Sequence, residues 1–278
     1  MTNEQRQKNL EKIQEFTLMD DDFMNVCFSA YPELTEFVLR IVMKRNDLHV
    51  VHVETQKTYT NLLGRSVRFD IDATDDKGVE YDIEIQKADR GASPRRARYH
   101  SSAKDFDLLK KKQPFDALPE TYVIFITEQD VLGEGEPIYF VERMIVKSGR
   151  RFNDGEHIIY VNCAHKDFAT ELGKLVHDLN CSNPNEMFFP QIADVVRYYK
   201  ETEEGREKMS QIMEELINEA VAEAVERKDI EYAQKMEQKD IEYAQKLIQF
   251  GALSFEDIAK LTSLPLEKIR EIAGQTVV

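Results

Sequence analysis

The sequence predicts an α/β fold, with a core β-sheet flanked by helices and a long helical C-terminal tail. Three observations predict it. Residues 67–86 alternate strictly between apolar and polar side chains around a glycine-containing turn, which is typical of a β-hairpin. Residues 122–127 form a short continuous apolar run, as central strands covered on both faces do. From residue 188 onward the pattern is helical and heavily charged.

Helices are expected before the hairpin. Residues 1–16 are polar and predicted to be helical, and residues 18–46 contain two amphipathic helices, the second of which starts at Pro32. The first strand is predicted at residues 48–54. Residues 58–63 are predicted to connect it to the hairpin.

A helix is expected directly after the hairpin, over residues 92–112, with Ser93 as its N-cap. Its apolar residues, including Tyr99 and Phe106, are expected to pack on the core, while the Arg and Lys residues form the polar face. The remaining predicted elements of this part are strands at 138–141 and 158–161 and a helix at 166–180. This order of elements indicates a sheet covered by helices.

The charge of the chain is uneven. Its 278 residues include 37 Lys and Arg and 52 Asp and Glu, and the net charge of −15 is not that of a protein coated in basic residues for nucleic acid. Residues 87–112, however, hold nine basic and three acidic residues, a local charge of +6. Such a segment suits contact with phosphates, although a solvated helix face has the same composition.

The cysteines and the lack of long apolar runs predict a cytoplasmic protein that does not enter a membrane. Cys27, Cys163 and Cys181 are far apart and form no CxxC pair, so neither a zinc site nor a disulfide framework is indicated. The polar N-terminus lacks the apolar stretch of a signal peptide, and no apolar run approaches membrane-spanning length.

The turn around Gly78 predicts the register of the hairpin, because a glycine accepts the left-handed conformation of a three-residue loop. Four carboxylates then face one another on one side of the sheet, which is destabilising unless open water, raised pKa values or a bound cation offsets the repulsion. Hard divalent cations prefer carboxylate oxygens, whereas a solvated acidic face is the plainer interpretation. The predicted cross-strand pairs are Asp72 with Asp82, Asp70 with Glu84, and Arg68 with Gln86.

Asp70 followed by Glu84-Ile85-Gln86 resembles the D…(D/E)-x-K motif of the PD-(D/E)XK nuclease superfamily, with Gln86 in the position of the lysine. Within that superfamily the chain resembles the Rpn group of recombination-promoting nucleases and transposases, which carry an R-x-D strand, a hairpin and an E-x-Q strand. The opening helices, the arginine-rich run before Tyr99 and the C-terminal pattern share this resemblance. It implies a restriction-endonuclease-like core sheet flanked by helices.

The resemblance also implies a metal site. Asp70, Glu84 and the backbone carbonyl of Ile85 would hold Mg²⁺, which activates water and stabilises charge on the scissile phosphate. Nucleases of this superfamily often add an acid from the helix before the hairpin, and Glu36 is the candidate for that ligand. Glu33 competes with it, and a solvent-facing role fits either residue.

The lysine of the motif needs a replacement, because Gln86 is neutral and is expected only to orient the attacking water. Arg68, predicted opposite Gln86, is the expected source of positive charge. The alternation places Lys87 on the core face instead. Phosphate contacts are expected from Arg68 together with Arg95, Arg96 and Arg98.

The function implied by the resemblance is that of a Mg²⁺-dependent DNA endonuclease which hydrolyses phosphodiester bonds and promotes recombination or transposition. A catalytically inactive DNA-binding or scaffolding protein with a self-associating helical tail is the alternative. Nothing in the sequence separates DNA from RNA as the substrate.

An 11-residue repeat covers residues 228–249. This period favours a nearly straight or slightly right-handed coil, and its narrow apolar stripe needs a partner, so a coiled-coil homodimer or packing on the core is expected. The stripe comprises Ile230, Ala233, Ile241, Ala244 and Leu247. The predicted domains are a nuclease-like domain at 1–182, a charged helical extension at 183–250 and a helical hairpin at 251–278.

Overall fold

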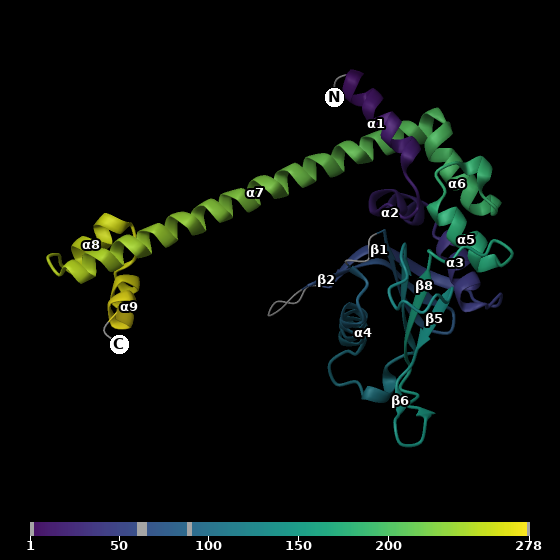
Figure 1. The fold of residues 1–278 in the computed structure, drawn as a ribbon, viewed down its shortest axis with the longest axis horizontal. Helices are drawn as coiled ribbons and strands as arrows, with labels where there is room; N and C mark the ends of the chain where they lie inside the picture. Colours follow the sequence, from purple (N-terminus) through teal and green to yellow (C-terminus); the bar gives the residue numbers. More distant parts are fainter. Residues whose placement is uncertain (1–2, 60–65, 88–90, 277–278) are drawn as a thin grey trace. The chain divides into compact units, whose positions relative to one another are not determined.

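The computed structural model describes residues 3–59, 66–87 and 91–276 (Figure 1). The chain divides into two compact units, Met1–Ser210 and Gln211–Val278. This division comes later in the chain than the predicted boundary after residue 182. One reason is that α6 (Pro190–Glu201) packs on the first unit, for example through an edge-to-face contact between Tyr199 and Phe23.

The first unit is built on a six-stranded mixed sheet with the order β1-β2-β3-β4-β8-β5. β1, β2 and β3 pair antiparallel, β3, β4 and β8 pair parallel, and β5 is antiparallel to β8. The central apolar strand and the two later strands are therefore where the sequence predicts them. The strands are β1 (Val50–Tyr59), β2 (Val67–Asp75), β3 (Glu80–Gln86), β4 (Thr121–Thr127), β5 (Ile138–Val141) and β8 (Glu156–Asn162).

A separate two-stranded ribbon, β6 (Met144–Ile145) and β7 (Arg150–Arg151), lies between β5 and β8 in the chain. The helices of the first unit lie on both sides of the sheet, with α4 on one side and α3 and α5 on the other (Figure 1). They are α1 (Asn3–Glu15), α2 (Asp21–Ala30), α3 (Glu33–Met43), α4 (Pro94–Leu108), α5 (Glu171–Asn180) and α6, with short 3-10 helices at Phe115–Ala117 and Pro184–Glu186.

β1 is longer than predicted. Thr58 and Tyr59, expected in a connection, continue the strand and pair with β2. The side chains of Lys57 and Tyr59 both donate to the Asp72 carboxylate, at 2.5 and 3.1 Å, so these polar residues gain partners in the fold that local alternation does not reveal. The rest of the predicted connection, residues 60–63, lies outside the described residues.

The hairpin has the register that its turn predicts. Gly78 has a φ of 78°, and β2 pairs with β3 through Asp72 opposite Asp82 and Ile71 opposite Ile83. The carboxylate face of this hairpin is buried rather than solvated. The repulsion between these carboxylates is offset mainly by basic side chains from neighbouring elements and by raised pKa values.

Beyond these backbone pairs, at the start of β2 and the end of β3, side chains connect the two strands. In the part of the chain that the structure describes, the backbone pairing expected between Asp70 and Glu84 and between Arg68 and Gln86 is not formed. Instead, the Asp70 backbone N–H donates to Glu84 Oε1 at 3.0 Å. The alternation of the hairpin places Phe69 on the face opposite the carboxylates. Its ring instead stacks on His100 of α4, which contacts the Asp82 carboxylate.

α4 packs on the sheet with polar side chains. His100 and Lys104 are buried, whereas Phe106 is 89% exposed and Tyr99 is also exposed. α4 is shorter than the helix predicted over residues 92–112. The prediction of its buried face is wrong, because Tyr99 and Phe106 were expected to pack on the core. The physical reason is that carboxylates on β2 and β3 face α4, so its basic side chains gain more from burial than its aromatic ones.

α5 is also shorter than the helix predicted from residue 166. It begins at Glu171 because the Thr170 hydroxyl accepts a hydrogen bond from the backbone N–H of Gly173 and caps the helix.

The second unit consists of most of α7 (Glu203–Phe250), from Gln211 onward, together with α8 (Phe255–Thr262) and α9 (Leu266–Thr276). The predicted helical hairpin is confirmed, with Ser254 as the N-cap of α8. Ala244, from the repeat, is buried in a cluster with Ile258 and Ile269, so part of the apolar stripe is covered within the chain. Ile230, earlier in the stripe, is exposed.

Within the described ranges, no helix combines the length and the apolar character needed to cross a membrane.

Candidate active site

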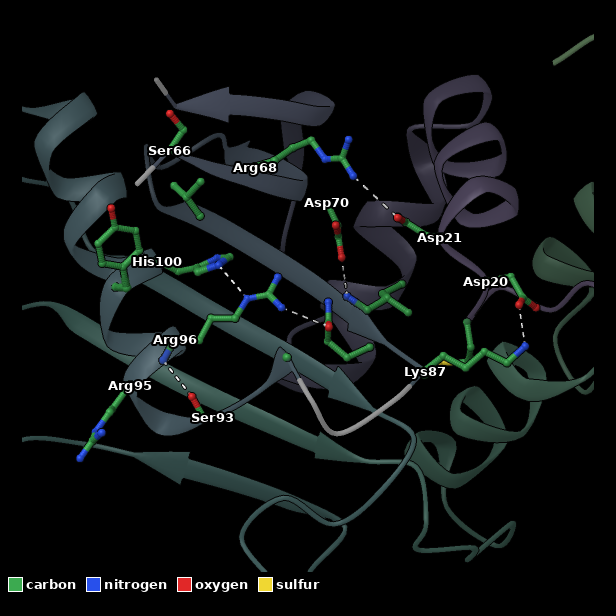
Figure 2. A pocket seen from close by; sticks show the side chains of 16 residues that line it. Asp20, Asp21, Ser66, Arg68, Asp70, Lys87, Ser93, Arg95, Arg96 and His100 are labelled. Carbon is green, nitrogen blue, oxygen red and sulfur yellow. Dashed lines mark hydrogen bonds and ion pairs between the residues drawn. The ribbon is translucent and has the colours of Figure 1, made fainter. Parts of the chain in front are cut away.

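A pocket of about 840 Å³ opens where β2 and β3 separate (Figure 2). Its walls come from four parts of the first unit: the start of α2, the first residues of β2, the end of β3 and the first turns of α4. The charged and amide side chains that line it are Asp20, Asp21, Arg68, Asp70, Gln86, Lys87, Arg95 and Arg96. Segments far apart in the sequence therefore bring both signs of charge to one pocket.

Asp70 and Glu84 are each tied to the other's strand. Besides the bond from the Asp70 N–H to Glu84, Asp70 Oδ2 accepts a hydrogen bond from the backbone N–H of Ile85 at 3.0 Å. Both carboxylates are buried, and Asp70 and Ile85 line the pocket. A carboxylate oxygen has two lone pairs, so these bonds leave acceptor capacity for a cation.

Arg96, and not Arg68, supplies the positive charge beside Gln86. Its guanidinium donates to Gln86 Oε1 at 3.2 Å and to Glu84 Oε2 at 2.7 Å, and its Nε donates to His100 Nε2 at 3.1 Å. Arg68 instead lies 3.8 Å from the Asp21 carboxylate. The guanidinium of Arg96 therefore links two residues of the motif to α4.

Gly91 allows this close packing. A Cβ at that position would come within 2.3 Å of Gln86 Oε1 and 2.4 Å of Arg96 Nη1, so any larger residue would force the pair apart. The glycine thus serves the contact between the end of β3 and the first turn of α4.

His100 joins Glu84 to Asp82. Its Nδ1 lies 2.9 Å from Asp82 Oδ2 and 3.6 Å from Glu84 Oε1. Because Nε2 accepts from Arg96, the geometry assigns a ring proton to Nδ1, which donates to Asp82. Asp82, Glu84 and His100 offer ligand atoms that all lie within 4.8 Å of one another, and Asp82 Oδ1 is buried without a hydrogen-bond partner.

These residues fit a divalent cation, since carboxylate oxygens and imidazole are its common ligands. Two donor sets share Glu84. The predicted set adds Asp70 and the Ile85 carbonyl and adjoins the pocket. The second set adds Asp82 and His100, is fully buried and contains the unpartnered oxygen. His100 could join it only by releasing its Nδ1 proton or its hydrogen bond from Arg96.

Burial controls the acid–base properties of the site. It raises the pKa of Asp70 to about 6 and raises the pKa values of Glu84 and Asp82 well above their ordinary range, with neighbouring carboxylates adding to the effect on all three. Asp72 behaves oppositely. Burial alone would raise its pKa, but Lys104 and a second lysine hold the pKa of this carboxyl below its ordinary value.

Lys104 and His100 contact the buried carboxylates of the site, and the sequence alone did not predict this. Lys104 Nζ contacts the Asp72 carboxylate and lies 3.2 Å from Glu80. Arg96, His100 and Lys104 are spaced four residues apart, and side chains at that spacing share one face of a helix. This spacing is the feature of the sequence that could have placed Lys104 and His100 on the same face of α4 as Arg96.

Lys87 does not lie on the core face, which is where the alternation of the hairpin predicts it. Its side chain is about half exposed, lines the pocket and forms an ion pair with Asp20 at 2.5 Å. The carboxylate of Asp20 in turn lies at the start of α2, so this pair closes one side of the pocket (Figure 2).

The structure places Glu36 away from the pocket. Its carboxylate accepts from the Val50 backbone N–H at 2.9 Å and pairs with Arg40 at 2.7 Å, which joins α3 to the start of β1. Neither Glu36 nor Glu33 is among the described residues that line the pocket. Of the predicted phosphate-binding residues on α4, Arg95 lines the pocket and is exposed, whereas Arg98 is exposed outside it.

A family model for the PD-(D/E)XK nuclease family transposases matches residues 32–176, more than half of the 278 residues. The chain belongs to this family. The resemblance drawn from Asp70 and the Glu84-Ile85-Gln86 strand is thereby confirmed, and so is the fold class that it implied. Searches of curated proteins and of solved structures found no match.

Membership of the PD-(D/E)XK nuclease family transposases indicates a nuclease or transposase-like function, with DNA as the substrate that the family name implies. The matched residues contain β1 to β4, α4 and β8, and therefore every wall of the pocket except the start of α2.

Proposed function

We propose that the protein is a divalent-cation-dependent DNA endonuclease that hydrolyses phosphodiester bonds in the pocket between β2, β3 and α4. The observation that supports it most strongly is the arrangement of Asp70 and Glu84. Both carboxylates are buried, and each accepts a hydrogen bond from a backbone N–H of the other's strand. They lie beside a pocket that arginines line. A carboxylate pair next to positive charge is what phosphodiester cleavage requires.

In this proposal, Asp70, Glu84 and the Ile85 carbonyl hold Mg²⁺, which when bound supplies Lewis acidity and lowers the pKa of water. Gln86 orients the attacking water with its amide group. Its Oε1 is already fixed by the hydrogen bond from Arg96, so the amide plane is held in place for this role.

Arg96 replaces the lysine of the D…(D/E)-x-K motif. A guanidinium stays charged at any working pH and can donate to two acceptors at once. Arg96 is about one-third exposed and lines the pocket, so it can reach a phosphate while it holds Gln86 and Glu84. Charge that develops on the phosphate would be stabilised by this fixed donor.

The test is cleavage of supercoiled plasmid in Mg²⁺ and in EDTA by wild type, Asp70→Ala and Glu84→Ala, with Glu33→Ala as an exposed acidic control. Wild type and the control should cut only with Mg²⁺, and the two site variants should not cut. Equal cutting by all four proteins would refute the proposal. DNA binding without cutting, unchanged in Asp70→Ala, would identify an inactive DNA-binding protein, and an RNA substrate in parallel would reveal an RNA-directed nuclease.

We also propose that the enzyme acts in the cytoplasm, promotes recombination or transposition, and forms a homodimer through its C-terminal helices. The free thiols support the compartment, and the family's transposase character supports the role. Ile217, Val221 and Val225, spaced four residues apart on α7, are exposed and support self-association. Light scattering after gel filtration should give twice the 32.4 kDa chain mass. A monomer would exclude the dimer.

A further inference from the structure

The ribbon β6–β7 projects from the first unit (Figure 1). Residues 143–152 contain four basic residues and no acidic one, in a chain whose net charge is −15. All of these residues are exposed, and Val146 in the loop between the two strands is 96% exposed. The active-site proposal assigns no role to this ribbon.

The base of the ribbon is anchored, and its tip is not. Arg143 forms ion pairs with Asp154 and Glu156, and Phe152 donates its backbone N–H to the Arg143 carbonyl at 2.8 Å. Lys147 and Arg150, nearer the tip, form no ion pair with any described residue. Their charge is therefore available to a partner.

The ribbon adjoins the far end of α4. Thr121, at the start of β4, donates its backbone N–H to the carbonyl of Gly155 at 2.8 Å, which joins the segment that follows the ribbon to the sheet. Burial raises the pKa of Asp105 in the last turns of α4, and the nearby Arg143 charge opposes that rise. Lys110, Lys111 and Lys112 follow α4 directly and are exposed. Exposed basic residues thus occur at the pocket, after α4 and on the ribbon.

We propose that the β6–β7 ribbon is a second DNA-contacting element, which enters a groove of the duplex that flanks the phosphate bound in the pocket. The inference rests on the proposed nuclease function for its choice of ligand. A two-stranded ribbon has the dimensions of the major groove, and exposed cations at its tip suit the phosphates on either side. α4 has 15 residues and a length of about 22 Å, so the ribbon meets the duplex roughly seven base pairs from the pocket.

The test is the affinity for a fluorescent duplex, measured in EDTA across a series of salt concentrations for wild type and K147Q/R150Q. Both substituted side chains are exposed, so melting temperature should not change. We expect roughly tenfold weaker binding for the variant and a flatter salt dependence, by about 1.8 in the slope of log K against log salt, since each lost phosphate contact contributes about 0.9. The control K166Q/K246Q removes two exposed lysines elsewhere and should bind like wild type.

Plasmid cleavage by the same proteins separates this inference from the proposed function. Weaker binding by K147Q/R150Q supports the ribbon contact even if no protein cuts DNA. Cleavage by wild type with unchanged binding by K147Q/R150Q overturns the ribbon contact alone. Wild type that neither binds nor cuts the duplex overturns both the ribbon contact and the proposed nuclease function. A wild-type oligomer that K147Q/R150Q disperses, with DNA binding unchanged, would assign the ribbon to contact with a second copy and overturn the proposal.

Discussion

Replacing Lys104 with methionine should lower the free energy of unfolding of the first unit by about 3 kcal/mol. The Lys104 side chain is 1% exposed and contacts the Asp72 and Glu80 carboxylates. Removing one partner of a buried ion pair costs about 3–5 kcal/mol because the remaining charge is left uncompensated. The lower end applies here because Lys57 keeps its contact with Asp72 at 2.5 Å and partly compensates the carboxylate.

Thermal and urea unfolding of the full chain would measure this loss. For a unit of this size, 3 kcal/mol corresponds to a fall in Tm of roughly 6–12 °C. Lys110→Met, at an exposed position, should stay within about 0.5 kcal/mol of wild type. In an Asp72→Asn background, Lys104→Met should lower the free energy of unfolding by clearly less, because the Asp72 charge that the lysine compensates is already absent. An equal loss in both backgrounds, or no loss at all, would refute the idea that buried ion pairs hold α4 on the sheet.

Arg96→Ala should lower the plasmid cleavage rate about 100-fold or more, as loss of one fixed donor to a developing charge does, and Arg96→Lys should recover part of it. The Mg²⁺ affinity from titration calorimetry should rise steeply between pH 5 and 8, because the pKa of Asp70 is raised to about 6 and that of Glu84 lies well above its ordinary range, so protons compete with the ion at low pH. Gly91→Ala should reduce cleavage while leaving the fold intact, since a Cβ there displaces Gln86 and Arg96.

In the metal-free protein, the free energy of unfolding should change with pH in the opposite direction to the Mg²⁺ affinity. The folded pKa of Asp70 is about 6 and lies above its ordinary value of 3.8, so the folded chain holds this proton more tightly. The stability contributed by this group is therefore present below about pH 4 and is lost as the pH rises through 6. Added Mg²⁺ should raise Tm at pH 8 and have little effect at pH 5. A Tm increase that is independent of pH would contradict the assignment, as would full activity of Arg96→Ala or Gly91→Ala.

The hairpin was predictable because its information is local. Gly78 and the strict alternation fix the turn and the register, and these place Asp72 opposite Asp82 as the structure has it. The D…E-x-Q spacing then singles out Asp70 and Glu84 as candidate site residues. Patterns that span a turn and two strands need no knowledge of the rest of the fold.

The orientation of α4 was not predictable from its own composition. Tyr99 and Phe106 are more apolar than His100 and Lys104, yet the latter two are buried. Their partners are carboxylates on β2 and β3, and only the assembled sheet presents them to the helix. The same reason explains why Arg68 was preferred over Arg96, since the strands separate just where the sequence predicts continued pairing.

The proposed metal site is tested most directly by locating a divalent ion in crystals of the protein soaked in Mn²⁺, from the anomalous difference density. The proposed metal site predicts a peak that contacts both Asp70 and Glu84, at about 2.2 Å from a carboxylate oxygen of each. It would be contradicted by a peak that contacts only Asp82 and His100, or by well-ordered carboxylates at residues 70 and 84 without any peak between them.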